Sequence, residues 1–214
     1  MYVPAHFAVS DRQALHELIR HRPLGVLVTQ GANGLDANHL PFELETDGEG
    51  LGTLIGHVAR ANPIWKDVAD GSQVLVVFRA EDAYVSPNWY PSKHETHKQV
   101  PTWNYRVAHA AGAVKFRDDE AFLRRVVGRL TDTHEAPRPA PWRMSDAPED
   151  YMQAMLKAIV GVEIRIEALV GKFKLSQNRE MRDRLSLGEA LKRQGDTALG
   201  QAILDAAAGT NGAS

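Results

Sequence analysis

Residues 24–44 read LGVLVTQGANGLDANHLPFEL, and this stretch carries the pattern that decides the fold. Residues 24–29 and 38–44 are rich in residues that favour strands, and the turn-forming sequence QGANG at residues 30–34 separates them. The same alternation of short strand and turn continues through residues 53–57, 74–79, 102–109 and 112–116. Short strands without a helix between each pair predict an antiparallel barrel rather than a doubly wound parallel sheet.

Patterns typical of helices flank these strands. Ser10 and Gln13 form a capping box that opens a predicted helix over residues 10–21. Asn62 and Pro63 suit the cap and the first turn of a short helix over residues 61–69. Further helical patterns cover residues 119–131, 149–160, 187–194 and 197–208, and a strand pattern runs from residue 162 to residue 174. We therefore predict one α+β domain over residues 1–208 and a flexible tail over residues 209–214.

The composition excludes several classes of protein. The 214 residues carry a net charge of -2, so no global positive field attracts nucleic acid or an anionic membrane. The sequence contains no cysteine, which excludes disulfides, thiol catalysis and cysteine-ligated metal centres. The amino terminus lacks the pattern of a signal peptide, and no apolar run is long enough to cross a bilayer. A cytoplasmic protein without a membrane span is the expectation.

Aromatic residues are concentrated in one part of the chain. They make up 7% of the sequence, but Tyr84, Trp89, Tyr90, Trp103 and Tyr105 fall within one short window. Aromatic rings with polar edges stack on planar heterocycles, and the nearby polar side chains could read the edges of such a ring. The alternative is that these rings form part of the core or of a subunit interface.

Two other segments could bind an anion or a polar ring. In GHVARANPIW (residues 56–65), a strand end leads into a helix start, where free N–H groups, Arg60 and His57 could bind a phosphate. A simple cap at Asn62 beside a solvated arginine explains that segment more economically. In FKLSQNR (residues 173–179), Lys174 could meet a phosphate, but the pattern alone is also that of a strand end and a helix cap.

Several catalytic and binding motifs are absent from the sequence. It contains no glycine-rich dinucleotide or phosphate loop, no nucleophile elbow and no HExxH zinc motif. The segment HETH (residues 94–97) offers three potential zinc ligands. Because it lies between Pro91 and Pro101 among polar residues, we interpret it as an exposed loop and predict no metal site.

The segments together, in this order, resemble the PaiB family of FMN-binding proteins, which are often described as FMN-binding negative transcriptional regulators. The family has the split-barrel flavin-binding fold that pyridoxamine phosphate oxidases share. The resemblance runs from residue 1 to about residue 191 and departs at residues 79–82, where relatives commonly have a Gly-Pro pair. The matching motifs are MYVPAHF (1–7), HLP (39–41), GHVARANP (56–63), AYVSPNWY (83–90), VPTWNY (100–105), IVG (159–161) and KLSQNR (174–179).

The resemblance implies a homodimer with two FMN sites at its interface, each built from both chains. It places the phosphate and ribityl side at His57, Arg60 and Asn62, with help from Lys174. It places the ring side at Ser86, Trp89, Trp103, Gln177 and Asn178. The resemblance therefore favours the anion-binding interpretation of residues 56–63 over the simple helix cap.

Three functions follow as expectations. The resemblance implies an FMN-binding flavoprotein with a role in negative transcriptional regulation. The alternatives are a flavin-dependent oxidoreductase acting on a small molecule, or a split barrel that binds another planar cofactor such as haem. Direct DNA binding has little support, because the second of the two last helical patterns is rich in alanine and has almost no side chains that could read bases.

Overall fold

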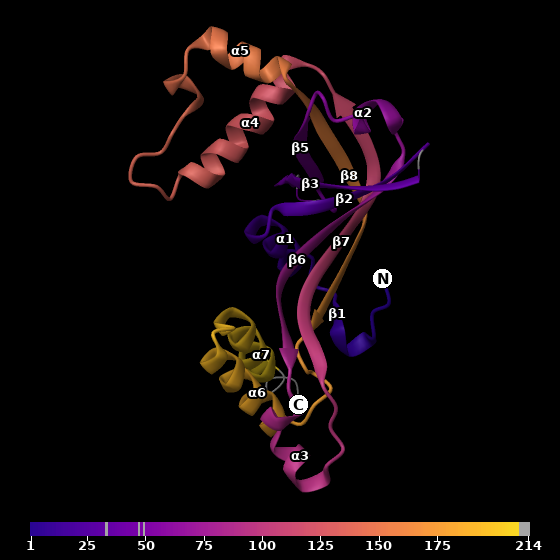
Figure 1. Cartoon of the computed structure of the whole chain (residues 1–214), viewed down its shortest axis with the longest axis vertical. Coiled ribbons are helices and arrows are strands. Elements are labelled where there is room, and N and C mark those ends of the chain that lie inside the picture. Colours follow the sequence, from indigo (N-terminus) through magenta and orange to yellow (C-terminus); the bar gives the residue numbers. More distant parts are fainter. Residues whose placement is uncertain (33, 47, 49, 210–214) are drawn as a thin grey trace. The chain divides into compact units, whose positions relative to one another are not determined.

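The computed structural model describes residues 1–32, 34–46, 48 and 50–209. Its strands are β1 (Ala8–Val9), β2 (Leu24–Gly31), β3 (Gly34–Pro41), β4 (Glu43–Glu45), β5 (Thr53–Ala59), β6 (Gln73–Val85), β7 (Thr102–Arg117) and β8 (Ile159–Lys174). Its α-helices are α1 (Arg12–His21), α2 (Ile64–Asp67), α3 (Pro91–Thr96), α4 (Glu120–Glu135), α5 (Glu149–Lys157), α6 (Met181–Gln194) and α7 (Thr197–Gly209). Three 3₁₀ turns, η1 (Ala5–Phe7), η2 (Pro87–Trp89) and η3 (Met144–Asp146), complete the elements of the described residues (Figure 1).

The chain forms two compact units that share its long strands. The first unit comprises Met1–Asp11, Arg79–Ala108 and Val170–Ser214, and the second comprises Arg12–Phe78 and His109–Leu169. Strands β6, β7 and β8 each contribute residues to both units. Hydrogen-bonded strands follow the order β3-β2-β6-β7-β8-β5-β4, and β1 pairs with β8. The single domain expected over residues 1–208 stays a prediction.

The second unit contains the antiparallel pairs β2–β3, β2–β6, β4–β5 and β5–β8. Gly25 of β2 makes room for the large side chains of its core, because a Cβ there would lie 2.7 Å from Val76 and 2.9 Å from Phe78. The rings of Phe42 and Phe78 meet edge to face with centroids 6.1 Å apart. Leu15, Leu18 and Ile19 of α1 follow helical spacing and are buried.

Helix α4 packs against the second unit's sheet through one apolar ridge. The Asp119 carboxylate caps the helix by accepting the N–H of Phe122 at 2.9 Å. Phe122, Val126 and Leu130 then form a buried cluster with Ile55 of β5. Gly161 of β8 leaves space for the Phe122 ring, since a Cβ there would lie 2.5 Å from it.

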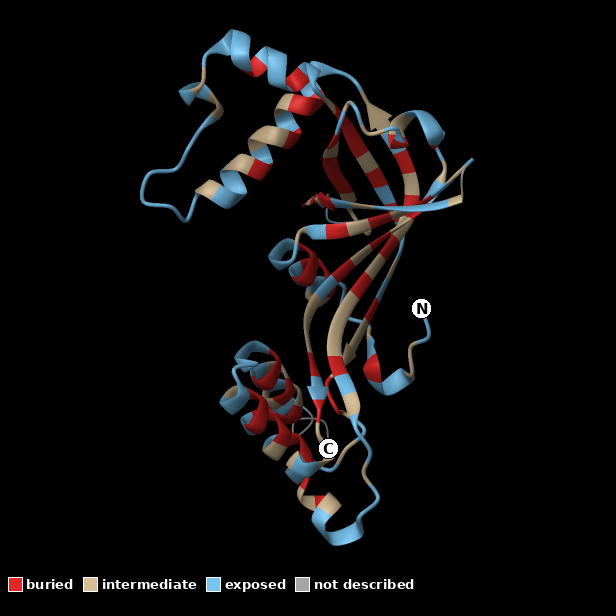
Figure 2. Ribbon diagram, in the orientation of Figure 1, coloured by how far each residue is buried: buried red, intermediate tan, exposed pale blue. Residues whose placement is uncertain are grey.

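The first unit has its own core between the ends of the long strands and helices α6 and α7. Eight buried residues form it, and these are Ala83, Val85, Tyr90, Leu175, Leu187, Leu191, Leu199 and Ile203. The two helices lie side by side and turn their buried faces inward (Figure 2). Gly188 and Gly200 allow this close approach, because a Cβ at Gly200 would lie 2.6 Å from the carbonyl oxygen of Gly188. Gly195, with φ 97°, ends α6 in the left-handed conformation.

One predicted strand break is wrong. The strands expected over 102–109 and 112–116 form the single strand β7, Thr102–Arg117. Gly112 marks a close backbone contact instead of a turn, since a Cβ there would lie 1.9 Å from the carbonyl oxygen of Arg165.

Several predicted boundaries also differ. Helix α1 begins at Arg12 instead of Ser10, and Gln13 Nε2 donates to Glu17 Oε1 at 3.1 Å. The helix expected over 61–69 is reduced to Ile64–Asp67, although Asn62 Oδ1 still accepts the N–H of Ile64. Residues 38–44 divide between β3 and β4, and residues 149–160 between α5 and β8. Helix α6 begins at Met181, earlier than the predicted residue 187.

The last described helix, α7, ends at the first residue of the predicted tail. Gly209 is the last residue of α7, and the rest of the tail expected over 209–214 lies outside the described residues. Within the described ranges, no helix is both long enough and apolar enough to span a membrane. The cytoplasmic location stays a prediction.

Candidate functional site

The guanidinium of Arg60, which was predicted to bind a phosphate, is hydrogen-bonded to other residues of the second unit. Nη1 donates to Asp118 Oδ2 at 2.9 Å, and Nη2 donates to Asp118 Oδ1 and to the carbonyl oxygen of Ile159. Nε donates to the carbonyl oxygen of Lys157. The hydrogen bonds to Asp118 raise the pKa of Arg60 and lower that of Asp118. The side chain therefore ties the end of β5 to the start of β8.

The two residues predicted beside Arg60 differ in their environment. The Asn62 amide donates to Asn38 Oδ1 at 2.6 Å and accepts from Ile64, so both of its groups are bonded inside the chain. His57 of β5 lies opposite Gly161 of β8. Its Nδ1 is buried and has no hydrogen-bond partner in the structure. Burial lowers the pKa of His57, so the imidazole is neutral near pH 7.

In the first unit, the structure brings Lys174 and Trp103 together. Lys174 Nζ donates to the Trp103 carbonyl oxygen at 2.7 Å and to Thr102 Oγ1. The Lys174 amine is half-buried. Burial is the main cause that lowers its pKa, and the positive charges of Lys172 and Arg179 lower the pKa further. The end of β8 therefore holds a fixed cation against the start of β7.

An aromatic groove lies on β6 and β7 in the same unit. Its volume is about 410 Å³, and its lining is Arg79, Asp82, Trp103, Tyr105 and Val107. Trp103 is 54% exposed, and its ring meets that of Tyr84 edge to face at 6.1 Å. The volume falls in the range of small-molecule sites, roughly 300–1,000 Å³. An exposed indole and phenol beside a cation suit a planar ring that carries an anionic group.

The other four predicted ring-side residues also belong to the first unit. Ser86 caps the 3₁₀ turn η2, and Trp89 packs against the buried cluster below it. The Gln177 amide accepts the N–H of Leu175 at 2.7 Å and donates to the Phe173 carbonyl oxygen at 2.6 Å. Asn178 is exposed. None of these four residues lines the aromatic groove.

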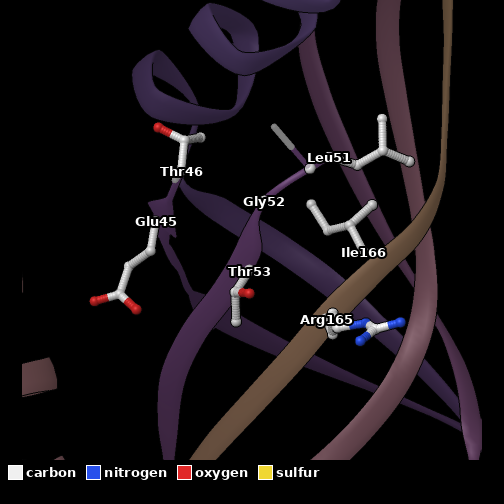
Figure 3. A pocket seen from close by; sticks show the side chains of 8 residues that line it. Glu45, Thr46, Leu51, Gly52, Thr53, Arg165 and Ile166 are labelled. Carbon is white, nitrogen blue, oxygen red and sulfur yellow. The ribbon is translucent and has the colours of Figure 1, made fainter. Parts of the chain in front are cut away.

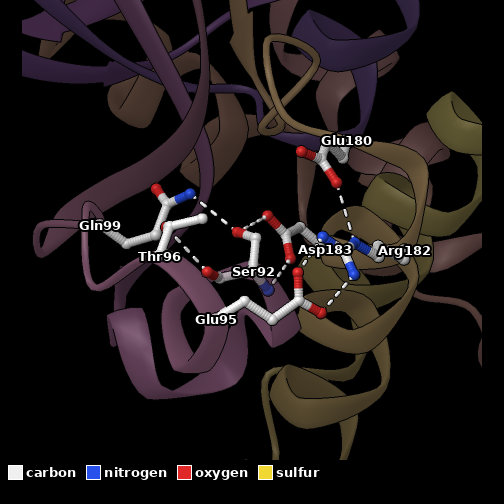
Figure 4. A network of polar contacts seen from close by, with 7 residues as sticks. All are labelled: Ser92, Glu95, Thr96, Gln99, Glu180, Arg182 and Asp183. Carbon is white, nitrogen blue, oxygen red and sulfur yellow. Dashed lines mark hydrogen bonds and ion pairs between the residues drawn. The ribbon is translucent and has the colours of Figure 1, made fainter.

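The HETH segment is exposed, as expected, but it is not a loop, because His94, Glu95 and Thr96 belong to a helix and His97 follows as its C-cap. Residues Pro91–Thr96 form α3, which a buried network joins to α6 (Figure 4). Asp183 accepts the Ser92 backbone N–H at 3.0 Å and the Ser92 hydroxyl at 2.5 Å. At the exposed edge, Arg182 forms ion pairs with Glu95 and Glu180. No group of three or more His, Asp or Glu side chains in the described part of the chain could hold a metal ion.

A separate hollow of about 530 Å³ lies in the second unit (Figure 3). Its lining is Glu45, Thr46, Gly50, Leu51, Gly52, Thr53, Arg165 and Ile166, which includes none of the predicted site residues. Glu45 is bound there by Arg125 and Arg129. The hollow therefore has no link to the predicted cofactor site.

The last helix, α7, has little that could read DNA. Helix α7 contains no lysine or arginine, and its exposed side includes Gln201 and Asp205. Its inner face packs on α6 through Leu199 and Ile203. A recognition helix needs cationic and polar side chains toward the major groove, and α7 lacks them.

Sequence comparison identifies relatives along most of the chain. A sequence model of the family described as "Putative FMN-binding domain" matches residues 1–168. "Uncharacterized protein AFUA_5G13800" of Aspergillus fumigatus is 34% identical over 248 residues, covering 95% of this chain and 95% of the fungal protein. "Protease synthase and sporulation protein PAI 2" of Bacillus subtilis is 28% identical over 194 residues, covering 91% of this chain and 90% of the bacterial protein.

Structure comparison bears on the fold. The FAD and heme binding protein from Mycobacterium smegmatis aligns with a TM-score of 0.57 at 20% identity, over 78% of this chain and 73% of that chain. The conserved hypothetical protein Rv2991 from Mycobacterium tuberculosis aligns with a TM-score of 0.59 at 13% identity, over 84% and 94%. The predicted α+β split-barrel fold with an antiparallel sheet and flanking helices is confirmed.

Proposed function

We propose that this chain, which belongs to the family described as "Putative FMN-binding domain", binds FMN noncovalently and acts as a flavoprotein. The observation that carries the proposal is the aromatic groove, where Trp103 and Tyr105 line one side of a cavity of about 410 Å³. Lys174 Nζ donates to the Trp103 carbonyl oxygen, so a cation lies beside the backbone that carries this ring. A ring surface and a nearby cation fit a flavin and its phosphate.

Bound FMN supplies one- and two-electron transfer, and the protein supplies binding and orientation. Trp103 and Tyr105 would stack against the ring. Lys174 would stabilise the negative charge of the phosphate. The phosphate role expected for Arg60 and Asn62 stays a prediction, and their side chains bond within the chain, as that of Lys174 does.

Absorption and titration test this proposal. The purified protein, or the apoprotein after addition of FMN, is expected to show a flavin spectrum that coelutes with the protein. We expect Trp103→Ala to weaken FMN binding about 3- to 10-fold, because stacking of one aromatic ring contributes about 0.5–1.5 kcal/mol. The control is Trp142→Ala, which removes an indole that is 42% exposed and lies in the second unit.

Two results would contradict the proposal. If neither the purified protein nor the FMN-treated apoprotein carries flavin, the proposed function is wrong. If Trp142→Ala weakens binding as much as Trp103→Ala, the groove is not the flavin site. The same spectrum tests the haem alternative, because haem and flavin bands differ.

A flavin-dependent oxidoreductase activity is the second candidate, and His57 favours it. The Nδ1 atom of His57 is buried and has no hydrogen-bond partner in the structure. The imidazole is neutral near pH 7, so this nitrogen is free to accept a proton. If NADH or NADPH reduces bound FMN anaerobically, His57→Gln is expected to change the pH profile of that step while FMN remains bound. An unchanged profile would exclude His57 from proton transfer.

We propose that any regulatory role is indirect instead of exerted by direct DNA contact. The support is the absence of lysine and arginine from α7. Fluorescence anisotropy with duplex DNA at low salt, repeated at rising salt, is expected to show no salt-dependent binding. Tight binding that weakens steeply as salt rises would contradict this proposal.

We also propose that the chain works as a homodimer. The first unit exposes Tyr2 (82%), Tyr84 (47%) and Val170 (41%) in addition to Trp103, and exposed apolar side chains of this size commonly mark interfaces. Sedimentation equilibrium is expected to give twice the chain mass of 23.6 kDa. A single species at the chain mass would overturn the dimer.

A further inference from the structure

An ion pair forms part of the wall of the aromatic groove, and the proposed function gives it no role. Arg79 and Asp82 line the groove together with Trp103, Tyr105 and Val107. Arg79 Nη2 lies 2.5 Å from Asp82 Oδ2, and the two side chains are 66% and 23% exposed. One positive and one negative charge therefore lie beside the surface on which a planar ring would stack.

An irregularity in β6 brings these two residues to the same groove. Val74, Val76 and Phe78 are buried in the first part of the strand, whereas Ala83 and Val85 are buried at its end. Side chains alternate between the two faces of a strand, so this change from even to odd positions indicates one extra residue, as in a β-bulge. Residues three apart on a regular strand would point to opposite faces. The irregularity therefore explains why both charged side chains line one groove.

The other charges around the groove differ in their placement. Glu81 is paired with Arg106, which follows Tyr105 on β7 and therefore belongs to the opposite face of that strand. Lys172 and Lys174 of β8 add positive charge near the aromatic residues of the groove. Among the described residues that line the groove itself, one is acidic and one is basic. The ion pair is therefore the charged element of the groove wall.

Charges beside a flavin ring change its reduction potential. Two-electron reduction makes the ring electron-rich, and the reduced ring becomes an anion when it loses a proton. A nearby cation therefore stabilises the reduced ring relative to the oxidised ring, and a nearby carboxylate has the opposite effect. Because Arg79 and Asp82 are bound to each other, their two effects largely cancel while the pair is intact.

We propose that Arg79 and Asp82 act as an electrostatic pair that sets the reduction potential of the flavin in the aromatic groove. Arg79 favours the reduced flavin, and Asp82 favours the oxidised flavin. The inference rests on the proposed flavin function and assigns to two groove residues a role that cofactor binding alone does not require. It also gives a reason for the irregularity in β6, which aims both side chains at the groove.

The test measures the reduction potential of bound FMN in the full-length protein. Wild type, Arg79→Gln, Asp82→Asn and the double variant are saturated with FMN and reduced anaerobically in equilibrium with a reference dye. At a fixed ambient potential, we expect Arg79→Gln to lower the ratio of reduced to oxidised flavin about three- to tenfold, since solvent partly screens an exposed charge. Asp82→Asn is expected to raise the ratio by a similar factor, and the double variant to lie close to wild type. Tenfold corresponds to about 30 mV for a two-electron couple.

A second ion pair of the chain provides the matched control. Arg138 and Glu135 are also three residues apart, and their side chains are 64% and 24% exposed. They belong to the second unit and do not line the aromatic groove. Arg138→Gln and Glu135→Gln are expected to leave the potential unchanged. Exposed ion pairs contribute little to stability, so all of these variants are expected to fold, and circular dichroism checks this.

The salt dependence separates an electrostatic effect from a local rearrangement. Because salt screens interactions between exposed charges, the shifts in Arg79→Gln and Asp82→Asn are expected to shrink as the ionic strength rises. Shifts of opposite sign that shrink in this way support the inference. Shifts that do not respond to salt would overturn it.

The remaining outcomes separate the inference from the proposed function. If FMN stays bound but the two single variants leave the potential unchanged, or move it in the same direction, the inference is wrong and the flavin function stands. Equal shifts in the variants of Arg138 and Glu135 would also overturn the inference, because the effect would then follow the total charge of the protein. If the wild type binds no FMN, the proposed function is wrong, and the inference with it.

Discussion

Replacement of Asp183 by alanine is expected to destabilise the first unit strongly. Asp183 is only 1% exposed, and its carboxylate accepts both the backbone N–H and the hydroxyl of Ser92. The Gln99 amide donates to the same hydroxyl at 2.9 Å. Asp183→Ala removes the acceptor and leaves the Ser92 N–H buried without a partner. Because this contact joins α3 to α6, its loss is expected to weaken the packing of the first unit.

The size of the effect follows from burial. A hydrogen bond to a charged group contributes about 1.5–3 kcal/mol, and Asp183 accepts two such bonds from Ser92. The free energy of unfolding is therefore expected to fall by about 3–6 kcal/mol. Glu95→Gln removes a carboxylate from an exposed ion pair with Arg182 on the same helices, and is expected to have a much smaller effect.

Urea denaturation followed by circular dichroism measures both variants. Asp183→Ala is expected to lower the midpoint with little change in slope, and Glu95→Gln to leave the midpoint nearly unchanged. Tryptophan fluorescence of the same samples checks that the two probes report one transition. If Glu95→Gln lowers the midpoint as much as Asp183→Ala, burial does not decide the strength of these contacts and the reasoning fails.

Two further predictions concern the second unit. Gly112→Ala is expected to destabilise the protein by about 3 kcal/mol, because its Cβ would lie 1.9 Å from the Arg165 carbonyl oxygen. Gly128→Ala in α4 is expected to stabilise by about 0.5–1 kcal/mol, since its nearest contact would be a permitted 3.7 Å, and thermal unfolding compares the two. Because burial lowers the pKa of His57 below its ordinary 6.5, the unfolded state binds the proton first, and stability falls as pH drops below about 6.5. His57→Gln is expected to flatten that fall in urea titrations at pH 5 to 7, and an unchanged slope would contradict the assignment.

The fold was largely predictable because its local signals agree with its packing. Strand β2 (Leu24–Gly31) contains the strand predicted at residues 24–29, but β3 (Gly34–Pro41) begins four residues before the strand predicted at residues 38–44. The strand break predicted between residues 109 and 112 is wrong because β7 runs through both predicted strands, and Gly112 lies within it at a close contact with the Arg165 carbonyl oxygen. The start of α6 was missed because Asp183 and Arg184 are buried charged residues, which break the apolar periodicity.

The candidate site was predictable in part, for a different reason. Trp103 and Lys174 stood out because aromatic and cationic residues cluster near them in sequence, and the structure brings these two into contact. Tyr105 was not predicted as a ring-side residue, although it lines the aromatic groove. The donors of Arg60 were misjudged because Asp118, which takes two of them, is distant in sequence.

The buried cluster of the first unit sets a limit on how the chain can be shortened. Five of its eight residues, Leu175, Leu187, Leu191, Leu199 and Ile203, come after residue 168, where the family match ends. A polypeptide cut at that point would keep Val85 and Tyr90 but lose the side chains that cover them. The boundary of sequence similarity is therefore not a boundary of folding, and a minimal version of this protein must retain both carboxyl-terminal helices.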